Sequence, residues 1–510
     1  MAGLLAAWAI HAQEMPLEYH FGEKYKDRYK YSNLLSFSET VSGEKILIRA
    51  YYTGLLLHPK GYLIERYNED LELLEEYNYK FRGADFIHGF VANGQIYLLF
   101  LEYDQEQGAY IYNLHQSPIG TYEFRITSLL AVTSDYVDQP LDKNYYNRNF
   151  KSGFTTTVLS DPDARTIAIS VQQKTKEAYS HRILVYNNQM KQILNIDFSQ
   201  PSQEKNYAFE ELAVAPDLSA VYLVGKAYFK KKRFKNEERK FQYELVRLSK
   251  QGTQFQEFDI PGKYSEAIKP LWKDNQLICA GFYADRKDNR YNGLQYFIVN
   301  PGDLSILKRK YNPFTQQFML DKFGKETEKV VKNLVFKGAY FTADGSLLFN
   351  AEEFFVTESM QANASGGRIR VERFHHNDIV SVRLGPDGSL QWARNINKTE
   401  VTQGDGAYAS YSSYTKNGQT YFFVCSATEA PQLINNKRLI FKQGMSRNRN
   451  VFVIRLDEAG EMSYEKIIDS REARLPLMVS SPLINYESDR VWFYAKLGGR
   501  KQLVGVEVGD

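Results

Sequence analysis

The stretch NDIVSVRLGPDGSLQWARNIN, residues Asn377–Asn397, decides the fold. A run rich in Val, Ile and Leu meets Pro-Asp-Gly, and a second apolar run follows. This pattern predicts two β-strands joined by a tight turn. Gly388 supplies the positive φ that such a turn needs, because glycine has no Cβ to clash there. The stretch is therefore a predicted β-hairpin.

The same pattern, Arg-Leu with Gly four residues after the Leu, also occurs at Leu245–Gly252 and Val453–Gly460. The interval from the first of these copies to Asn377–Asn397 is about twice the interval from Asn377–Asn397 to the last copy. This spacing predicts an eroded copy between the first two, and Phe297–Asp303 is found there. The chain is therefore built of repeats.

Each repeat also carries an earlier hairpin, whose turn is marked by Gly, Pro, Asn or Asp between apolar runs. These turns lie at Ser42-Gly43, Asn93-Gly94, Pro162-Asp163, Pro216-Asp217, Asp274-Asn275, Asp344-Gly345, Asn417-Gly418 and Ser488-Asp489. Two hairpins per repeat predict an all-β fold, a single β-propeller of eight four-stranded blades. An irregular first unit would leave seven blades. The last unit has three strands of its own, and we expect the N-terminal stretch Pro16–Tyr25 to add the fourth and close the propeller.

Two turn regions, DPDARTIAISV and APDLSAVYLVG, resemble the Ser-Pro-Asp-Gly-type repeats of TolB-like and WD40-like propellers. Nearly the whole chain, most closely at HHNDIVSVRLGPDGSLQWARNI, is similar to an uncharacterised family of exported Gram-negative bacterial β-propeller proteins. The resemblance implies the fold and an exported protein. It brings no activity with it.

The length of 510 residues would ordinarily suggest several domains, but a repeat array can form one body. We expect residues 13–510 to form one propeller domain, with a short helical insertion near residues 315–333 that breaks at Gly324. Residues 1–12 are interpreted as a residual signal peptide, because MAGLLAAWAIHAQ is apolar and ends in small or neutral residues. The expected location is periplasmic or secreted, and the expected state is a monomer.

The overall charge is nearly balanced, with 64 basic and 61 acidic residues and a net charge of +3. Nucleic acid is therefore not an expected partner. The basic run Lys230–Lys240 could attract acidic glycans or form a solvated hairpin. No later stretch approaches the roughly 18 apolar residues of a transmembrane helix. Cys279 and Cys425 occupy equivalent apolar strand positions, where buried thiols are common and a disulfide is not expected.

The longest segments between strands all fall on second-to-third-strand or inter-repeat connections, which share one end of each four-stranded unit. They are Ser128–Lys151, Lys230–Lys240, Ala284–Asn292, Thr315–Asn333, Glu358–Asn377, Lys398–Ala407 and Ala427–Asn450. Loops on a rigid scaffold often carry binding residues, so this long-loop face is the functional candidate. The alternative is that these long loops have no function and lie on a surface that tolerates insertions.

No sequence pattern points to a catalytic or cofactor site. There is no G-x-S-x-G, H-E-x-x-H, G-x-G-x-x-G, Walker A or C-x-x-C pattern. His375 and His376 are adjacent on an extended segment and should point to opposite sides, so a metal site is not expected. Trp392 has no tryptophan counterpart in other repeats, which disfavours a quinone-dependent dehydrogenase. No cofactor is expected.

The candidate ligand-binding residues are aromatic and charged side chains near the ends of the long loops. They are Tyr283, Arg286, Arg290, Tyr291, Glu352, Phe354, His376, Asp405, Tyr408 and Tyr411. Aromatic faces with charged neighbours suit sugars or peptide side chains. The favoured hypothesis is an exported, non-catalytic propeller that binds a glycan or a protein. The alternative is a carbohydrate-active hydrolase or lyase with carboxylates around the central funnel, where a carboxylate pair would need members from different blades.

Overall fold

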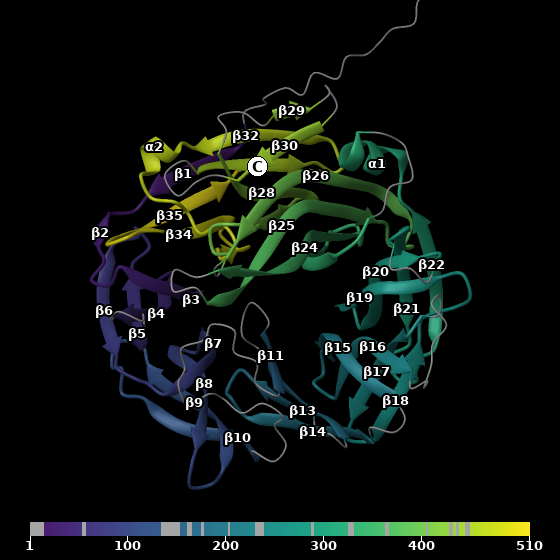
Figure 1. Cartoon of the computed structure of the whole chain (residues 1–510), viewed down its shortest axis with the longest axis horizontal. Coiled ribbons are helices and arrows are strands. Elements are labelled where there is room, and N and C mark those ends of the chain that lie inside the picture. The colour runs from purple at the N-terminus through teal and green to yellow at the C-terminus, as the bar shows by residue number, and fades with distance from the viewer. Residues whose placement is uncertain are drawn as a thin grey trace, which may run out of the picture. The chain divides into compact units, whose positions relative to one another are not determined.

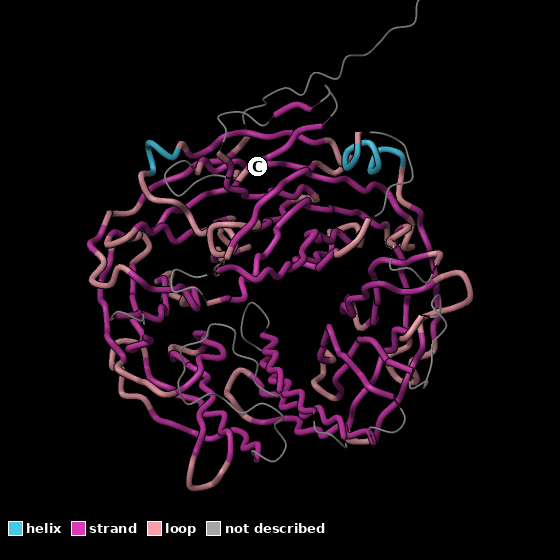
Figure 2. Tube along the Cα trace, viewed as in Figure 1, coloured by secondary structure: helices cyan, strands magenta, loops and turns pink. Residues whose placement is uncertain are grey.

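The computed structural model describes residues 15–509, apart from 54–57, 134–153, 161–165, 175–177, 202–204, 230–238, 287–289, 325–330, 363–366, 404–405, 428–431, 435–437 and 444–448. Nearly all of the described chain is strand, with two short helices, α1 (Gln316–Phe323) and α2 (Ser470–Ala473) (Figure 2). The expected signal peptide, residues 1–12, and most of the basic run lie outside the described residues.

The described strands form eight sheets, and in each of them four strands follow one another as an antiparallel meander. This is the sheet organisation of β-propeller blades. The prediction of an all-β fold with eight four-stranded units is confirmed, and the possibility of seven is wrong. Seven of the predicted first-hairpin turns lie between consecutive strands of their sheets, and the eighth, Pro162-Asp163, lies outside the described residues.

The chain divides into two compact units, which are described separately. One unit comprises Tyr29–Tyr311 and holds five sheets. The strands of its first three sheets are β3 (Tyr31–Glu39), β4 (Lys45–Thr53), β5 (His58–Tyr67) and β6 (Leu73–Tyr79); β7 (Ala84–Ala92), β8 (Gln95–Asp104), β9 (Ala109–Pro118) and β10 (Arg125–Thr133); β11 (Phe154–Ser160), β12 (Thr166–Lys174), β13 (Ala178–Asn187) and β14 (Gln192–Pro201). The last two sheets contain β15 (Lys205–Val214), β16 (Ala220–Phe229), β17 (Phe241–Ser249) and β18 (Gly252–Glu257); β19 (Tyr264–Lys273), β20 (Gln276–Ala284), β21 (Gly293–Val299) and β22 (Ile306–Pro313).

The other unit comprises the described residues within Met1–Arg28 and Asn312–Asp510 and holds three sheets (Figure 1). The first contains β23 (Leu334–Phe341), β24 (Leu347–Ala362), β25 (Arg368–Leu384), β26 (Leu390–Thr402), β30 (Arg438–Lys442) and β29 (Gln432–Ile434). The second contains β27 (Tyr411–Lys416), β28 (Gln419–Ser426), β31 (Asn450–Leu456) and β32 (Met462–Ile468). The third contains β33 (Leu483–Asn485), β34 (Arg490–Leu497), β35 (Arg500–Val508), β1 (Leu17–Phe21) and β2 (Tyr25–Lys26).

The middle strands of the sheets are buried on both faces, as their continuous apolar sequences predict. Strand β20 is buried from Leu277 to Ala284, whereas the fourth strand β18 alternates between exposed and half-buried residues. Apolar clusters join neighbouring sheets, and one of them unites Tyr222 and Leu245 with Cys279 and Phe297. Packing between sheets therefore forms the core, and each sheet needs its neighbour.

The hairpin that identified the repeat has the predicted geometry. Gly388 has a φ of 78° and Gly460, in the matching turn, has a φ of 80°. A Cβ at Gly460 would also lie 2.7 Å from the Trp392 ring, so this position needs glycine for space as well as for φ. In the eroded copy the positive φ falls on Leu304.

The N-terminal strand completes the last sheet, as predicted. Strand β1 pairs antiparallel with β35, from Leu17 opposite Val508 to Phe21 opposite Val504. After β2, the buried Asp27 forms an ion pair with the buried Lys496. This ion pair and the strand pairing hold the first described residues against the end of the chain.

Two segments expected to be loops contain strands within their described residues. Residues 358–377 continue β24 and β25 as an antiparallel hairpin that extends beyond the rest of the sheet. Within 427–450, β29 and β30 form a small hairpin, and β30 adds to the edge of β26 in parallel. In these strands the backbone N–H and C=O groups pair with each other, whereas in a long loop many of them would have to bind water.

Candidate functional site

The candidate site lies where β24 and β25 leave their sheet, at the end that carries the long connections. The pairing shifts between Glu352 and Phe354 on β24 and between His376 and Ile379 on β25. Such β-bulges turn side chains to new directions and are common beside functional sites. Here they bring several charged residues into the interior of the sheet.

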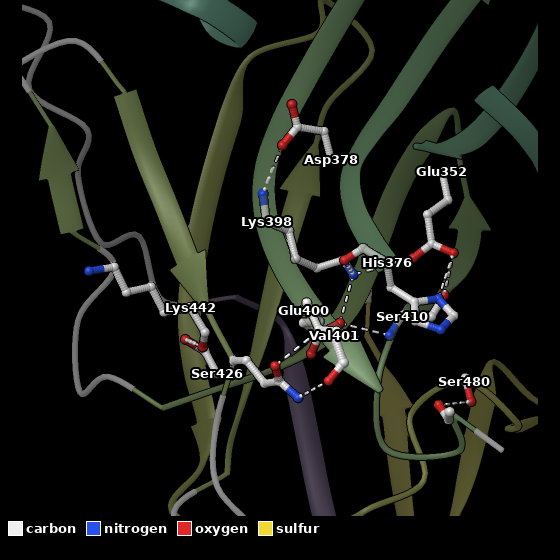
Figure 3. A network of polar contacts seen from close by, with 12 residues as sticks. Glu352, His376, Asp378, Lys398, Glu400, Val401, Ser410, Ser426, Lys442 and Ser480 are labelled. Carbon is white, nitrogen blue, oxygen red and sulfur yellow. Dashed lines mark hydrogen bonds and ion pairs between the residues drawn. The ribbon is translucent and has the colours of Figure 1, made fainter. Parts of the chain in front are cut away.

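Glu352 is the centre of this polar network and is completely buried. One carboxylate oxygen, Oε1, lies 3.3 Å from Lys398 Nζ. The other, Oε2, lies 3.3 Å from His376 Nδ1 and 3.3 Å from Lys337 Nζ, and accepts a 2.9 Å hydrogen bond from Ser410 Oγ. Four donors thus surround one carboxylate (Figure 3 shows all of them except Lys337).

These donors determine the protonation state of Glu352. Burial by itself opposes ionisation, but the hydrogen bond from His376 and the charges of Lys398 and Lys337 outweigh it. Together they lower the pKa of Glu352 to about 2. The carboxylate is therefore ionised at neutral pH and is unsuited to donating a proton.

Lys398 joins Glu352 to a second buried carboxylate. Its Nζ lies 2.7 Å from Glu400 Oε2 and donates to the backbone oxygen of His376 at 2.9 Å. Glu400 in turn accepts a 2.7 Å hydrogen bond from the backbone N–H of Ser410. Lys398 and Glu400 are 1% and 2% exposed, so the ion pairs are shielded from solvent.

Helix α1 is attached to the same region through its last turn. Lys322 Nζ lies 2.7 Å from Asp378 Oδ2 and 2.6 Å from Glu353 Oε2. Asp378 also accepts a 3.1 Å hydrogen bond from the backbone N–H of Lys398. Thr315 caps the start of the helix, and Gly324 ends it in a left-handed conformation. The helix is thereby tied to the strands that carry the network.

The structure brings together three of the candidate residues, Glu352, Phe354 and His376. Phe354 pairs directly across the hairpin with His376, and their ring centroids lie 5.1 Å apart. Tyr411 lies in the same region, where burial, with a further contribution from the charge of Glu352, raises its pKa well above the usual range. His375 stacks instead on Phe355, so the two histidines point in different directions.

The remaining candidates make other contacts, lie in the other unit or lie outside the described residues. Tyr408 donates to the backbone oxygen of Lys496 at 2.9 Å, and Asp405 lies outside the described residues. Four candidates belong to the other unit. There Tyr283 is buried beneath Lys263, Tyr291 stacks on Phe282, and Arg286 and Arg290 are exposed.

Sequence reasoning missed Lys337, Lys398, Glu400 and Ser410. Lysine and glutamate are rarely buried, so Lys398 and Glu400 were interpreted as the start of a loop. Their alternation along NKTEV was the available signal, because residues two apart on a strand share a face. Lys337 is the bulged residue between Phe336 and Gly338, and nothing in the sequence marks that bulge.

The other unit contains a buried carboxylate in a different environment. Glu266 Oε1 lies 2.7 Å from Arg239 Nη1, and Asp259 Oδ2 lies 3.6 Å from Nε of the same arginine. Burial raises the pKa of Glu266 to about 7, although the charges of Arg239 and Lys226 oppose this. Burial likewise raises the pKa of Asp259. One guanidinium thus serves the buried Glu266 and the half-buried Asp259.

Within the described residues, no group of three or more His, Cys, Asp or Glu side chains is placed to hold a metal ion. In the same part of the chain, no helix has the length and apolar character needed to cross a membrane.

No protein-family model matches the chain, and no curated protein matches it. Among solved structures, the β-propeller domain of the Trilobed protease from Pyrococcus furiosus is 9% identical, with a TM-score of 0.36 over 88% of this chain and 98% of that one. The polysaccharide lyase Uly1 is 10% identical, with a TM-score of 0.37 over 93% and 90%. A prolyl endopeptidase is 9% identical with a TM-score of 0.34, and the chain spans 46% of its length. These similarities say nothing about the activity of this chain.

Proposed function

We propose that this chain is a non-catalytic binding module that recognises a glycan or a protein at the end of the sheet bearing the Glu352 network. One observation carries the proposal: the central carboxylate of that network is held ionised by four donors, with a pKa of about 2. Glycoside cleavage needs one carboxyl group that still carries its proton and a second, ionised carboxylate that reaches the substrate. Glu352 is ionised and completely buried, so it suits neither role. Glu352 supplies a fixed charge and a rigid frame instead.

We also propose that the protein is exported, a location that suits the same role. The resemblance to exported bacterial propellers and the apolar character of residues 1–13 favour a periplasmic or secreted location. Surface polysaccharides and their protein partners are the ligands available there.

The alternative, a carbohydrate-active hydrolase or lyase, is favoured by one specific observation in the other unit. Glu266 has a pKa of about 7, the value expected of a general acid near neutral pH. It is however only 6% exposed and bound to Arg239, so a substrate would have to displace buried contacts.

A glycan array and a partner pull-down, run beside turnover assays on polysaccharides, test the proposal. The binding module predicts a retained glycan or protein and no cleavage products. Reproducible cleavage that Glu266→Gln abolishes and Glu352→Gln leaves intact would establish the alternative. The two substitutions change one charged group each, so each is the matched control for the other.

A further inference from the structure

We infer that the ligand at the Glu352 network is an acidic saccharide, whose carboxylate or sulfate group is bound by Lys337 and one of whose hydroxyl groups donates a hydrogen bond to His376. The inference rests on the proposed function and specifies its ligand. It follows from which members of the network reach solvent and which do not.

The two carboxylates that Lys398 bridges are buried, and the most exposed side chain that contacts Glu352 is a lysine. Glu352 and Glu400 are 0% and 2% exposed. The side chain of Lys337 is 37% exposed and that of His376 is 12% exposed. The more exposed carboxylates nearby, Asp378 at 13% and Glu353 at 21%, are paired with Lys322. A ligand approaching Glu352 therefore meets the Lys337 ammonium group first. That surface favours a negatively charged group.

Lys337 is available to a ligand because Glu352 is satisfied without it. Lys398, His376 and Ser410 already supply three contacts to the carboxylate. Lys337 is the bulged residue of β23, and its Nζ contacts the same Oε2 atom as His376 Nδ1. The two groups are thus neighbours, and the anionic group of a ligand could bind Lys337 while a hydroxyl of the same ligand donates to His376, without leaving Glu352 unpaired.

Glu352 also fixes the direction of His376. A carboxylate can only accept, so Nδ1 carries the hydrogen and Nε2 is left to face a ligand. Within the part of the chain that the structure describes, no residue forms a hydrogen bond with Nε2. A Cβ at Gly406 would lie 3.2 Å from Nε2, so a glycine there keeps this nitrogen uncrowded.

The aromatic side chain beside these donors favours a saccharide over an acidic peptide. Phe354 is half-buried, lies against His376 and stacks on Phe374 at a centroid distance of 6.5 Å. An aromatic face can pack against the C–H face of a pyranose ring while the charged substituent reaches Lys337. The combination fits an acidic sugar.

Calorimetric titration of the full chain tests the inference with four probes. These are hexagalacturonate, its methyl ester, a sulfated carrageenan hexasaccharide and hexaglutamate. We expect the two acidic saccharides to bind, and Lys337→Gln to weaken them at least about tenfold, since a charge-assisted contact is lost. Lys337→Arg should restore most of the affinity. Lys26→Gln, the same charge change at an exposed residue of β2 in the same unit, should have no effect.

Several results would overturn the inference. They are equal binding of the methyl ester, equal weakening by Lys26→Gln, tighter binding of hexaglutamate, or no binding of either acidic saccharide. Binding of a neutral glycan that does not depend on Lys337 would contradict the inference of an acidic ligand, and the proposed binding function would still hold. Cleavage of an acidic saccharide whose binding still depends on Lys337 would support the acidic ligand and contradict the non-catalytic function.

Discussion

Two of the buried carboxylates of this protein, Glu352 in one unit and Glu266 in the other, differ in the number of donors around them. Glu352 has four, of which two are lysines, and its pKa falls to about 2. Glu266 shares one arginine with Asp259, and its pKa rises to about 7. Burial is common to both, so burial alone does not decide the charge state. The number of compensating donors decides it. This number distinguishes Glu352, which stays ionised, from Glu266, which could act as an acid.

The largest expected effect comes from removing residues 13–26, which deletes β1 and β2. This exposes the edge of β35 in the unit that holds Glu352, and we expect the unfolding temperature to fall by on the order of 10 °C. Hydrogen exchange should show lost protection in β33–β35 and little change around Glu266. An unchanged melting curve would refute closure by the N-terminal strand.

Replacing the central cation of each cluster sharpens the comparison. Lys398→Met leaves Glu352 and Glu400 buried without their shared lysine, at a cost of roughly 3–5 kcal/mol in unfolding free energy. Arg239→Met should cost less, on the order of 1–2 kcal/mol, because Glu266 can take up a proton near neutral pH. Urea unfolding at pH 7 measures both. Equal losses would mean that the two clusters are electrostatically alike.

The two carboxylates should also give opposite dependences of stability on pH. The folded pKa of Glu266 is above its unfolded value, so the native state binds more protons between about pH 4.5 and 7. Stability should fall by on the order of 3 kcal/mol across that window. Glu352 has a lowered pKa, so its contribution is present above about pH 4.5 and is lost as the pH falls toward 2.

Two substitutions identify which carboxylate causes each dependence of stability on pH. Glu266→Gln should remove the loss of stability between pH 4.5 and 7, and Glu352→Gln should leave that loss in place. If the slope survives in Glu266→Gln, another group is responsible for it.

The smallest effect is expected at Lys337. Its ammonium is partly exposed and Glu352 retains three other donors, so Lys337→Gln should change the unfolding free energy by no more than about 0.5 kcal/mol. Thermal melts measure this directly. A loss approaching that of Lys398→Met would show that Lys337 is part of the buried frame and is unavailable to a ligand.

The repeat pattern made the fold predictable in detail. Apolar alternation and turn residues such as those around Gly388 are local, and they recur often enough to define every sheet. The closing strand Leu17–Phe21 could be predicted because the last repeat lacked one strand.

The site was only partly predictable, because it depends on bulges and on burial of charged residues. Glu352, Phe354 and His376 were found from their place at the loop end. Lys398 and Glu400 were missed because lysine and glutamate are rarely buried, although their spacing of two residues placed them on one face of a strand. Glu266 was missed because it lies at the shift between Ser265 and Ala267, and the sequence does not mark that bulge.

The most direct test of the account is the titration of the glutamate carboxyl carbons by NMR, with protein labelled at glutamate and signals assigned through Glu352→Gln and Glu266→Gln. The account predicts that Glu352 stays ionised down to a pH of about 2 and that Glu266 titrates near pH 7. A Glu352 signal that titrates above about pH 5 would contradict it, because the network would then not be the fixed charge on which the binding function depends.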